Sequence, residues 1–288
     1  MDIVPQLILN SIIDASIYLL IALGFWLAYR TAKFFNLAHG AVALAGAYAV
    51  LFFTKNLGIN LYPAIFLGIS VSGLLGLALD KFIYLPLRKR KASNMVLLIA
   101  SLGAYTVISA LLAIIFTSQF QSLSRLVPDQ KIYTIAGGNL TQIQLLMLLF
   151  GLIIFAGLAL MLKKTKFGHA ISAISDDEEV AKIVGINTNK IIGYVFFISS
   201  SIAGLAGIMV GLDTGIEPWR GLTLLLSGVV AVIIGGINDI FGVLLGCFIL
   251  GFVDNFGIWK INGEWRNTIT FGLLIIFLLF RPQGIIKK

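Results

Sequence analysis

Hydrophobic residues occupy this chain in long blocks that are separated by short polar segments. A block of about 20 apolar residues can cross a bilayer as a helix, because a helix satisfies its backbone hydrogen bonds internally. The pattern predicts an all-α polytopic membrane protein with eight or nine transmembrane helices in one domain over residues 1–288. The seventh and eighth predicted spans are short, which is typical of broken or re-entrant segments. The predicted spans are roughly 8–29, 35–53, 62–85, 95–117, 143–162, 191–211, 222–238, 240–256 and 267–281.

The composition supports a membrane location. Hydrophobic residues make up 59% of the chain and charged residues only 12%, against about 25% charged in soluble domains, and the mean hydropathy is +1.00. We therefore assign the net charge of +8 to loops at the membrane surface and not to nucleic-acid binding. The first apolar stretch is too long for a cleavable signal peptide, and the lone Cys247 cannot form an intrachain disulfide.

Lysine and arginine are distributed unevenly between alternate loops. With the N-terminus outside, 15 of the 21 Lys and Arg residues fall in inner loops or at the C-terminus, and six fall outside. The positive-inside rule favours this orientation, which puts the C-terminus in the cytoplasm. It also puts residues 163–190 there, a loop that holds nine of the 34 charged residues of the chain.

This charged loop carries signals for short helices. The run from Ser175 to Glu178 fits a capping box, with Ser at the N-cap and Glu at the third helical position. Gly185 can adopt a positive φ and end the helix. The sequence therefore predicts a helix over 176–184, preceded by a second short helix over 167–174. Two interpretations remain open, a solvated connector and a docking helix for a soluble partner.

Glycine and polar residues also interrupt the apolar pattern inside the predicted spans. Interruptions of this kind are typical of broken helices around a transport path, although glycines also let helices pack closely without a further role. Ionisable residues at membrane depth, here Asp14, His39 and Asp254, are functional candidates as well, and Asp254 is expected to pair with Lys260 or Arg266. The candidate path residues are Asn36, His39, Gly40, Gly228, Gly235 and Gly236.

Motifs for enzymatic chemistry are absent from the sequence. There is no GxxxxGK[ST] loop that would cradle ATP phosphates. Two His and one Cys, distant from one another, do not make a metal site. The sequence predicts a protein that is not an enzyme and binds no cofactor of its own.

Several segments form a specific combination. They are NLAHG and GAY near the N-terminus, FISSSIAGLAG, the pair Gly235-Gly236, and LLFRPQGI near the C-terminus. Together with the charged loop they resemble branched-chain amino acid ABC-transporter permeases of the LivH type, over almost the whole chain. The chain departs from that pattern at Ser172, Asp14 and the segment Ile237-Asn238-Asp239. The loop match rests on Gly168, Ala173, Asp177, Glu179, Ala181, Gly185, Ile186 and Asn187.

The resemblance implies a permease subunit of an ABC importer in the inner or plasma membrane of a prokaryote. The implied partners are a second, LivM-like permease, two cytoplasmic ATPases that bind the ATP, and an extracytoplasmic solute-binding protein. The expected cargo is a branched-chain or other amino acid, and the alternatives are a urea or short-amide permease and an ion-driven secondary transporter. The residues expected to couple to the ATPases are Gly168, Ala173, Ser175, Asp176, Asp177, Glu178, Glu179, Ala181, Gly185 and Asn187.

Overall fold

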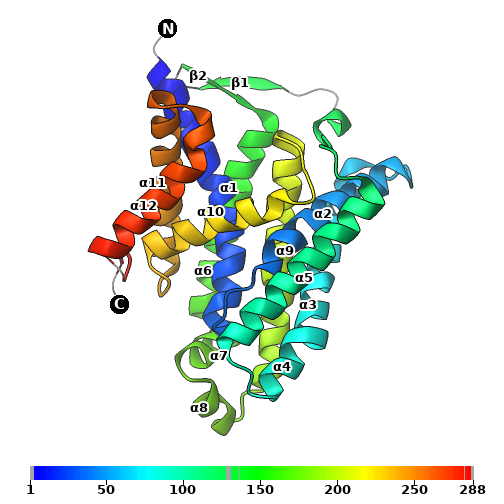
Figure 1. The fold of residues 1–288 in the computed structure, drawn as a ribbon, viewed down its shortest axis with the longest axis vertical. Coiled ribbons are helices and arrows are strands. Elements are labelled where there is room, and N and C mark those ends of the chain that lie inside the picture. The colour runs from blue at the N-terminus through cyan, green and yellow to red at the C-terminus, as the bar shows by residue number, and fades with distance from the viewer. Residues whose placement is uncertain (1–2, 128–130, 136, 282, 287–288) are drawn as a thin grey trace.

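The computed structural model describes residues 3–127, 131–135, 137–281 and 283–286. The chain is a tall helical bundle, and its N-terminus lies at the end opposite α7 and α8 (Figure 1). This confirms the predicted all-α membrane fold. The helices are α1 (Ile3–Ala32), α2 (Ala38–Lys55), α3 (Leu61–Leu79), α4 (Leu85–Lys89), α5 (Asn94–Phe116), α6 (Gln142–Lys164), α7 (Lys166–Asp176), α8 (Glu178–Ile183), α9 (Thr188–Asp213), α10 (Arg220–Gly235), α11 (Ile240–Lys260) and α12 (Arg266–Phe280).

Helix α10 differs from the other long apolar helices. It has 16 residues, which is about 24 Å at 1.5 Å per residue and shorter than the roughly 30 Å hydrocarbon core. It runs across the bundle instead of along it (Figure 1). In the described part of the chain, eight segments are long and apolar enough to span a membrane, and α10 is not among them. The seventh predicted span is therefore short, as predicted, whereas the eighth, also predicted as short, is the full-length helix α11 of 21 residues.

Glycines set the spacing between the central helices. A Cβ added at Gly40 would overlap the backbone of Gly221, and one at Gly207 would overlap the carbonyl of Ala43. These contacts bring α2 directly against α10 and α9, respectively. Small residues at such crossings are what allow helices to approach closely in a membrane.

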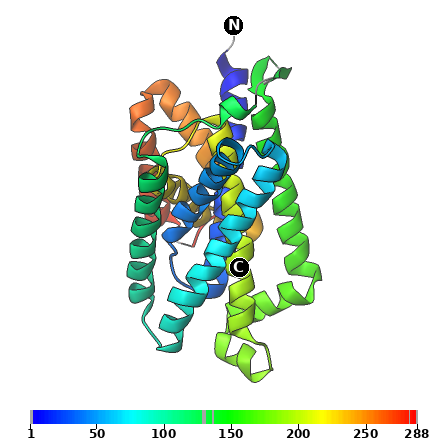
Figure 2. The same cartoon turned by 90° about the vertical axis from the view of Figure 1, so that its right-hand side faces the viewer.

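One end of the bundle is covered by a β-hairpin of β1 (Ile132–Ile135) and β2 (Gly138–Thr141), which pair antiparallel. Gln6 near the start of α1 bonds to the backbone of Asn139 in β2, donating to its carbonyl at 3.0 Å and accepting from its N–H at 2.7 Å. The charged loop with α7 and α8 projects from the other end (Figure 2). The fold thus presents two chemically different ends, one for each side of a membrane.

Candidate functional site

Helix α7 is anchored firmly to the bundle. The Thr165 hydroxyl accepts from the Gly168 N–H at 3.0 Å and caps the helix. Gly168, Ile171 and Ile174 are its buried residues. A Cβ added at Gly168 would overlap the Met161 carbonyl of α6, so α7 cannot shift without moving the end of α6.

The start of α8 lies two residues later than predicted. The chain is extended at Asp177, whose carboxylate accepts from the backbone N–H of Glu179 at 2.8 Å and of Val180 at 3.1 Å. Ser175 is therefore not the N-cap, and Ser175 and Asp176 belong to the last turn of α7. Glu178 does not reach back to close a capping box. It pairs with Lys182 Nζ at 2.8 Å.

The end of α8 confirms the predicted role of Gly185. Its φ is +87°, in the left-handed region. The Gly185 N–H donates to the Lys182 carbonyl and the Ile186 N–H to the Ala181 carbonyl, each at 3.0 Å. This is a Schellman motif, which uses a left-handed residue to satisfy the last carbonyls of a helix.

Helix α8 exposes an apolar surface at the tip of the molecule. Val180, Ile183 and Val184 are 53%, 83% and 69% exposed. We refer to these three residues as the α8 surface. Acidic residues surround them, with Glu179 exposed and Glu178 half-buried. An apolar surface with a polar rim is typical of a protein–protein contact.

A chain of contacts links α7 to the interior of the bundle. Arg30 at the end of α1 donates through Nε to the Ser175 hydroxyl at 3.4 Å. Its guanidinium lies 5.2 Å from the Trp26 ring centroid, a cation–π contact. Trp26 Nε1 donates to the Ile237 carbonyl, in the turn between α10 and α11, at 2.6 Å. Sequence reasoning missed Arg30 and Trp26, because nothing in the spacing indicates a contact with residues more than 140 positions away.

The predicted path residues near the start of α2 are buried in helix contacts. Tyr84 donates to the Asn36 side-chain oxygen at 2.8 Å. His39 is fully buried, and neither ring nitrogen has a hydrogen-bond partner in the described part of the chain. Gly40 lies inside the continuous helix α2, against Gly221. A helix broken at Gly40 is therefore wrong, and the link of these residues to a path stays a prediction.

The other predicted path residues also lie at close contacts. A Cβ added at Gly228 would lie 2.7 Å from an Ile21 methyl of α1, and one at Gly235 would overlap the backbone of Gly242 in α11. Gly236 has a φ of +107° and begins the turn after α10. Their assignment to a transport path also stays a prediction, since none of them lines the cavity described next.

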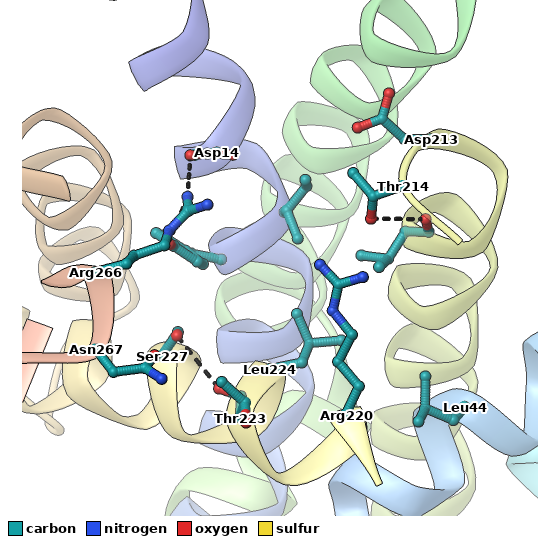
Figure 3. A pocket seen from close by; sticks show the side chains of 13 residues that line it. Asp14, Leu44, Asp213, Thr214, Arg220, Thr223, Leu224, Ser227, Arg266 and Asn267 are labelled. Atoms are coloured by element: carbon teal, nitrogen blue, oxygen red, sulfur yellow. Dashed lines mark hydrogen bonds and ion pairs between the residues drawn. The ribbon is translucent and has the colours of Figure 1, made fainter. Parts of the chain in front are cut away.

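A cavity of about 150 Å³ lies beside the end of α9 and the start of α10, and Figure 3 shows the side chains that line it. Its volume is on the order of ten times what one water molecule requires. Residues of α1, α2, α9, α10 and α12 surround it. We refer to it as the outer cavity, after the orientation predicted from the sequence. Its lining residues are Asp14, Ile17, Tyr18, Leu44, Val210, Asp213, Thr214, Arg220, Thr223, Leu224, Ser227, Arg266 and Asn267.

One wall of the outer cavity is a fully paired charge cluster. Arg266 of α12 donates to Asp14 of α1 (Figure 3). Its Nε also lies 3.7 Å from the carboxylate of Asp254, which confirms the predicted pairing of Asp254 with Lys260 or Arg266 in favour of Arg266. Tyr18 and Thr270 donate to the two oxygens of Asp254 at 2.6 and 2.8 Å. Buried charges are tolerated when they are paired and hydrogen-bonded in this way, so the cluster ties α1, α11 and α12 together.

Comparison with known proteins identifies relatives over the whole chain. The family described as the permease component of branched-chain amino acid transport systems matches residues 7–278. The BraD high-affinity branched-chain amino acid permease protein of Pseudomonas aeruginosa is 28% identical, over 98% of this chain and 95% of its own length. A probable LivH branched-chain amino acid permease protein of Methanocaldococcus jannaschii is 29% identical, over 99% and 93%.

A solved structure shares the fold. One chain of PsaBC from Streptococcus pneumoniae, solved in complex with a Fab, superposes with a TM-score of 0.55 over 95% of this chain and 91% of its own. The two sequences are 15% identical. This likeness supports the helical arrangement and carries no information on cargo.

Proposed function

Because the chain belongs to the family of permease components of branched-chain amino acid transport systems, we propose that it is the membrane subunit of an ABC importer for these amino acids. A membrane location follows from the family and from eight spanning-length apolar helices in the described residues. The cargo is the finer part of the proposal. It is supported by the relatives, whose names specify branched-chain amino acids.

The exposed α8 surface supports the proposal that a partner protein supplies the energy for transport. The sequence has no P-loop of its own, and three exposed apolar side chains project from an anchored loop. We assign this surface to the docking of one ATPase subunit, and the importer would contain two such ATPases, which hold the ATP. A second permease subunit and a solute-binding protein complete the proposed importer.

The contacts between α7 and the bundle suggest how a movement caused by the ATPase would be transmitted to the membrane helices. Motion of α7 would act on Arg30 through Ser175, and Trp26 would pass it to the turn after α10. Helix α10 borders the outer cavity, so its displacement would change access to that cavity. In this mechanism the helices move as rigid bodies between two states, and the ATPases shift the equilibrium between those states.

The proposed orientation places the β-hairpin outside and α8 in the cytoplasm. In intact spheroplasts, an Arg125→Cys variant should react with a membrane-impermeant maleimide, because Arg125 is exposed at the hairpin end. An Ile183→Cys variant should react only after lysis. The native Cys247 is fully buried and serves as the background control. Reaction of both variants from the same side would overturn the orientation.

Substrate competition tests the cargo. Cells that express the complete importer should take up radiolabelled leucine, and excess isoleucine or valine should reduce uptake at least tenfold. Urea and acetamide should change leucine uptake by less than twofold, because a neutral amide cannot replace a zwitterion at charged contacts. Leucine uptake that is absent while urea uptake depends on this chain would replace the proposal by the short-amide alternative.

A further inference from the structure

Two charged residues of the outer cavity lack an ionic partner. In the residues that the structure describes, neither Asp213 nor Arg220 lies within ion-pair distance of an opposite charge. Asp213 accepts from the Gln144 amide at 3.2 Å, and Arg220 donates to the Gly215 carbonyl at 3.4 Å. The acids and the arginine on the opposite wall are, by contrast, paired with one another. The cavity therefore offers one carboxylate and one guanidinium to a ligand.

Helix α10 presents a polar face to this cavity. Arg220, Thr223 and Ser227 follow one another at helical spacing and all line it. The opposite side of α10, with Gly221, is packed against α2. In Figure 3 Arg220 extends from the start of α10 toward the end of α9, which carries Asp213 and Thr214. Polar and ionisable groups that line a cavity of a membrane protein are functional candidates.

Four aliphatic side chains also line the cavity. They are Ile17, Leu44, Val210 and Leu224. Ligand pockets typically combine such apolar walls with a few convergent polar groups. A branched aliphatic side chain would bury its apolar surface against these residues.

We propose that the outer cavity is a binding site for zwitterionic aliphatic α-amino acids within the permease itself. Arg220 pairs with the α-carboxylate, Asp213 pairs with the α-ammonium, and the aliphatic wall takes the side chain. Charge-assisted hydrogen bonds of this kind are roughly twice as strong as neutral ones. The inference rests on the proposed function and adds a second point of selection after the solute-binding protein.

Protection of an introduced thiol tests the site directly. Ser227→Cys, in the complete importer in nanodiscs without its solute-binding protein, should react with a water-soluble maleimide. Leucine at 10 mM should slow the reaction at least threefold. Leucinamide lacks the carboxylate and 4-methylpentanoate lacks the ammonium group, so neither should protect at that concentration. Thr223→Cys on the same face repeats the measurement if the first variant does not assemble.

Charge variants identify the two contacts. In the Ser227→Cys background, Arg220→Gln or Asp213→Asn should raise the leucine concentration needed for protection at least tenfold. Arg125→Gln and Glu217→Gln are matched controls, since both residues lie outside the cavity lining. Each should change the leucine concentration needed for protection by less than twofold. Protection by leucinamide equal to that by leucine would remove the role of Arg220. An importer that carries leucine but shows no protection would overturn the site alone, whereas one that carries no aliphatic amino acid would overturn the proposed function.

Discussion

Replacing Gly40 by leucine should remove most of the folded permease from the membrane and abolish leucine import. Gly40 lies in α2 where that helix meets α10, and an added Cβ would overlap the backbone of Gly221. A backbone neighbour cannot rotate away as a side chain can. Overpacking of a tight contact costs about 1–3 kcal/mol and sometimes more, and here the two helices would have to separate. Size-exclusion chromatography of a fluorescent fusion measures the folded fraction, and leucine uptake measures activity.

Gly103→Leu is the matched control for this prediction. Gly103 also lies within a helix, α5, and no described atom lies within 4 Å of a Cβ added there. This variant should keep at least half of the wild-type folded fraction. A Gly40→Leu protein that assembles but does not import would instead support the sequence-based hypothesis that Gly40 borders the path. A variant that folds and imports normally would contradict both explanations.

Replacing Gly185 by valine should uncouple the permease from its ATPases without removing it from the membrane. A β-branched residue is strongly disfavoured at the positive φ of Gly185, at a cost of about 1–3 kcal/mol. The strain is local, because no described atom lies within 4 Å of an added Cβ. The end of α8 would unwind and displace the α8 surface, so co-purification of the ATPases should fall at least tenfold.

Two other variants isolate the cause of that loss. Gly185→Asn should retain the ATPases, because asparagine tolerates the left-handed region. Gly58→Val introduces the same backbone strain at a φ of +65° in the loop between α2 and α3, again with no described neighbour within 4 Å. It should keep the ATPases bound, since Gly58 is not part of α7 or α8. Normal ATPase binding by Gly185→Val would show that α8 is not the docking element.

The sequence predicted the helices well because length and hydropathy alone decide whether a segment can cross a bilayer. It did not reveal the oblique course of α10. The sequence indicated that this span is short, but its direction depends on close glycine contacts with α1, α2 and α11. The positive φ of Gly185 could be predicted, since glycine after a short helix has a specific conformational role.

The features that the sequence did not reveal depend on contacts between distant segments. Ser175 and Asp177 are both good N-caps, and the choice between them follows from the burial of Ile171 and Ile174, which holds α7 helical as far as Asp176. Asp213 and Arg220 stand near the ends of different helices, where charged residues are unremarkable. Only the fold shows that they share a cavity while the nearby acids are already paired.

The most direct test of the account is ATP-driven release of leucine from proteoliposomes. The vesicles hold the complete importer with its ATPases facing the medium, loaded solute-binding protein inside, and no ion gradient. Leucine should leave the lumen at least tenfold faster after addition of ATP than after addition of a non-hydrolysable ATP analogue. The Gly185→Val importer should show no such stimulation. Leucine movement that ignores ATP but follows an imposed proton or sodium gradient would contradict the account and identify an ion-driven transporter.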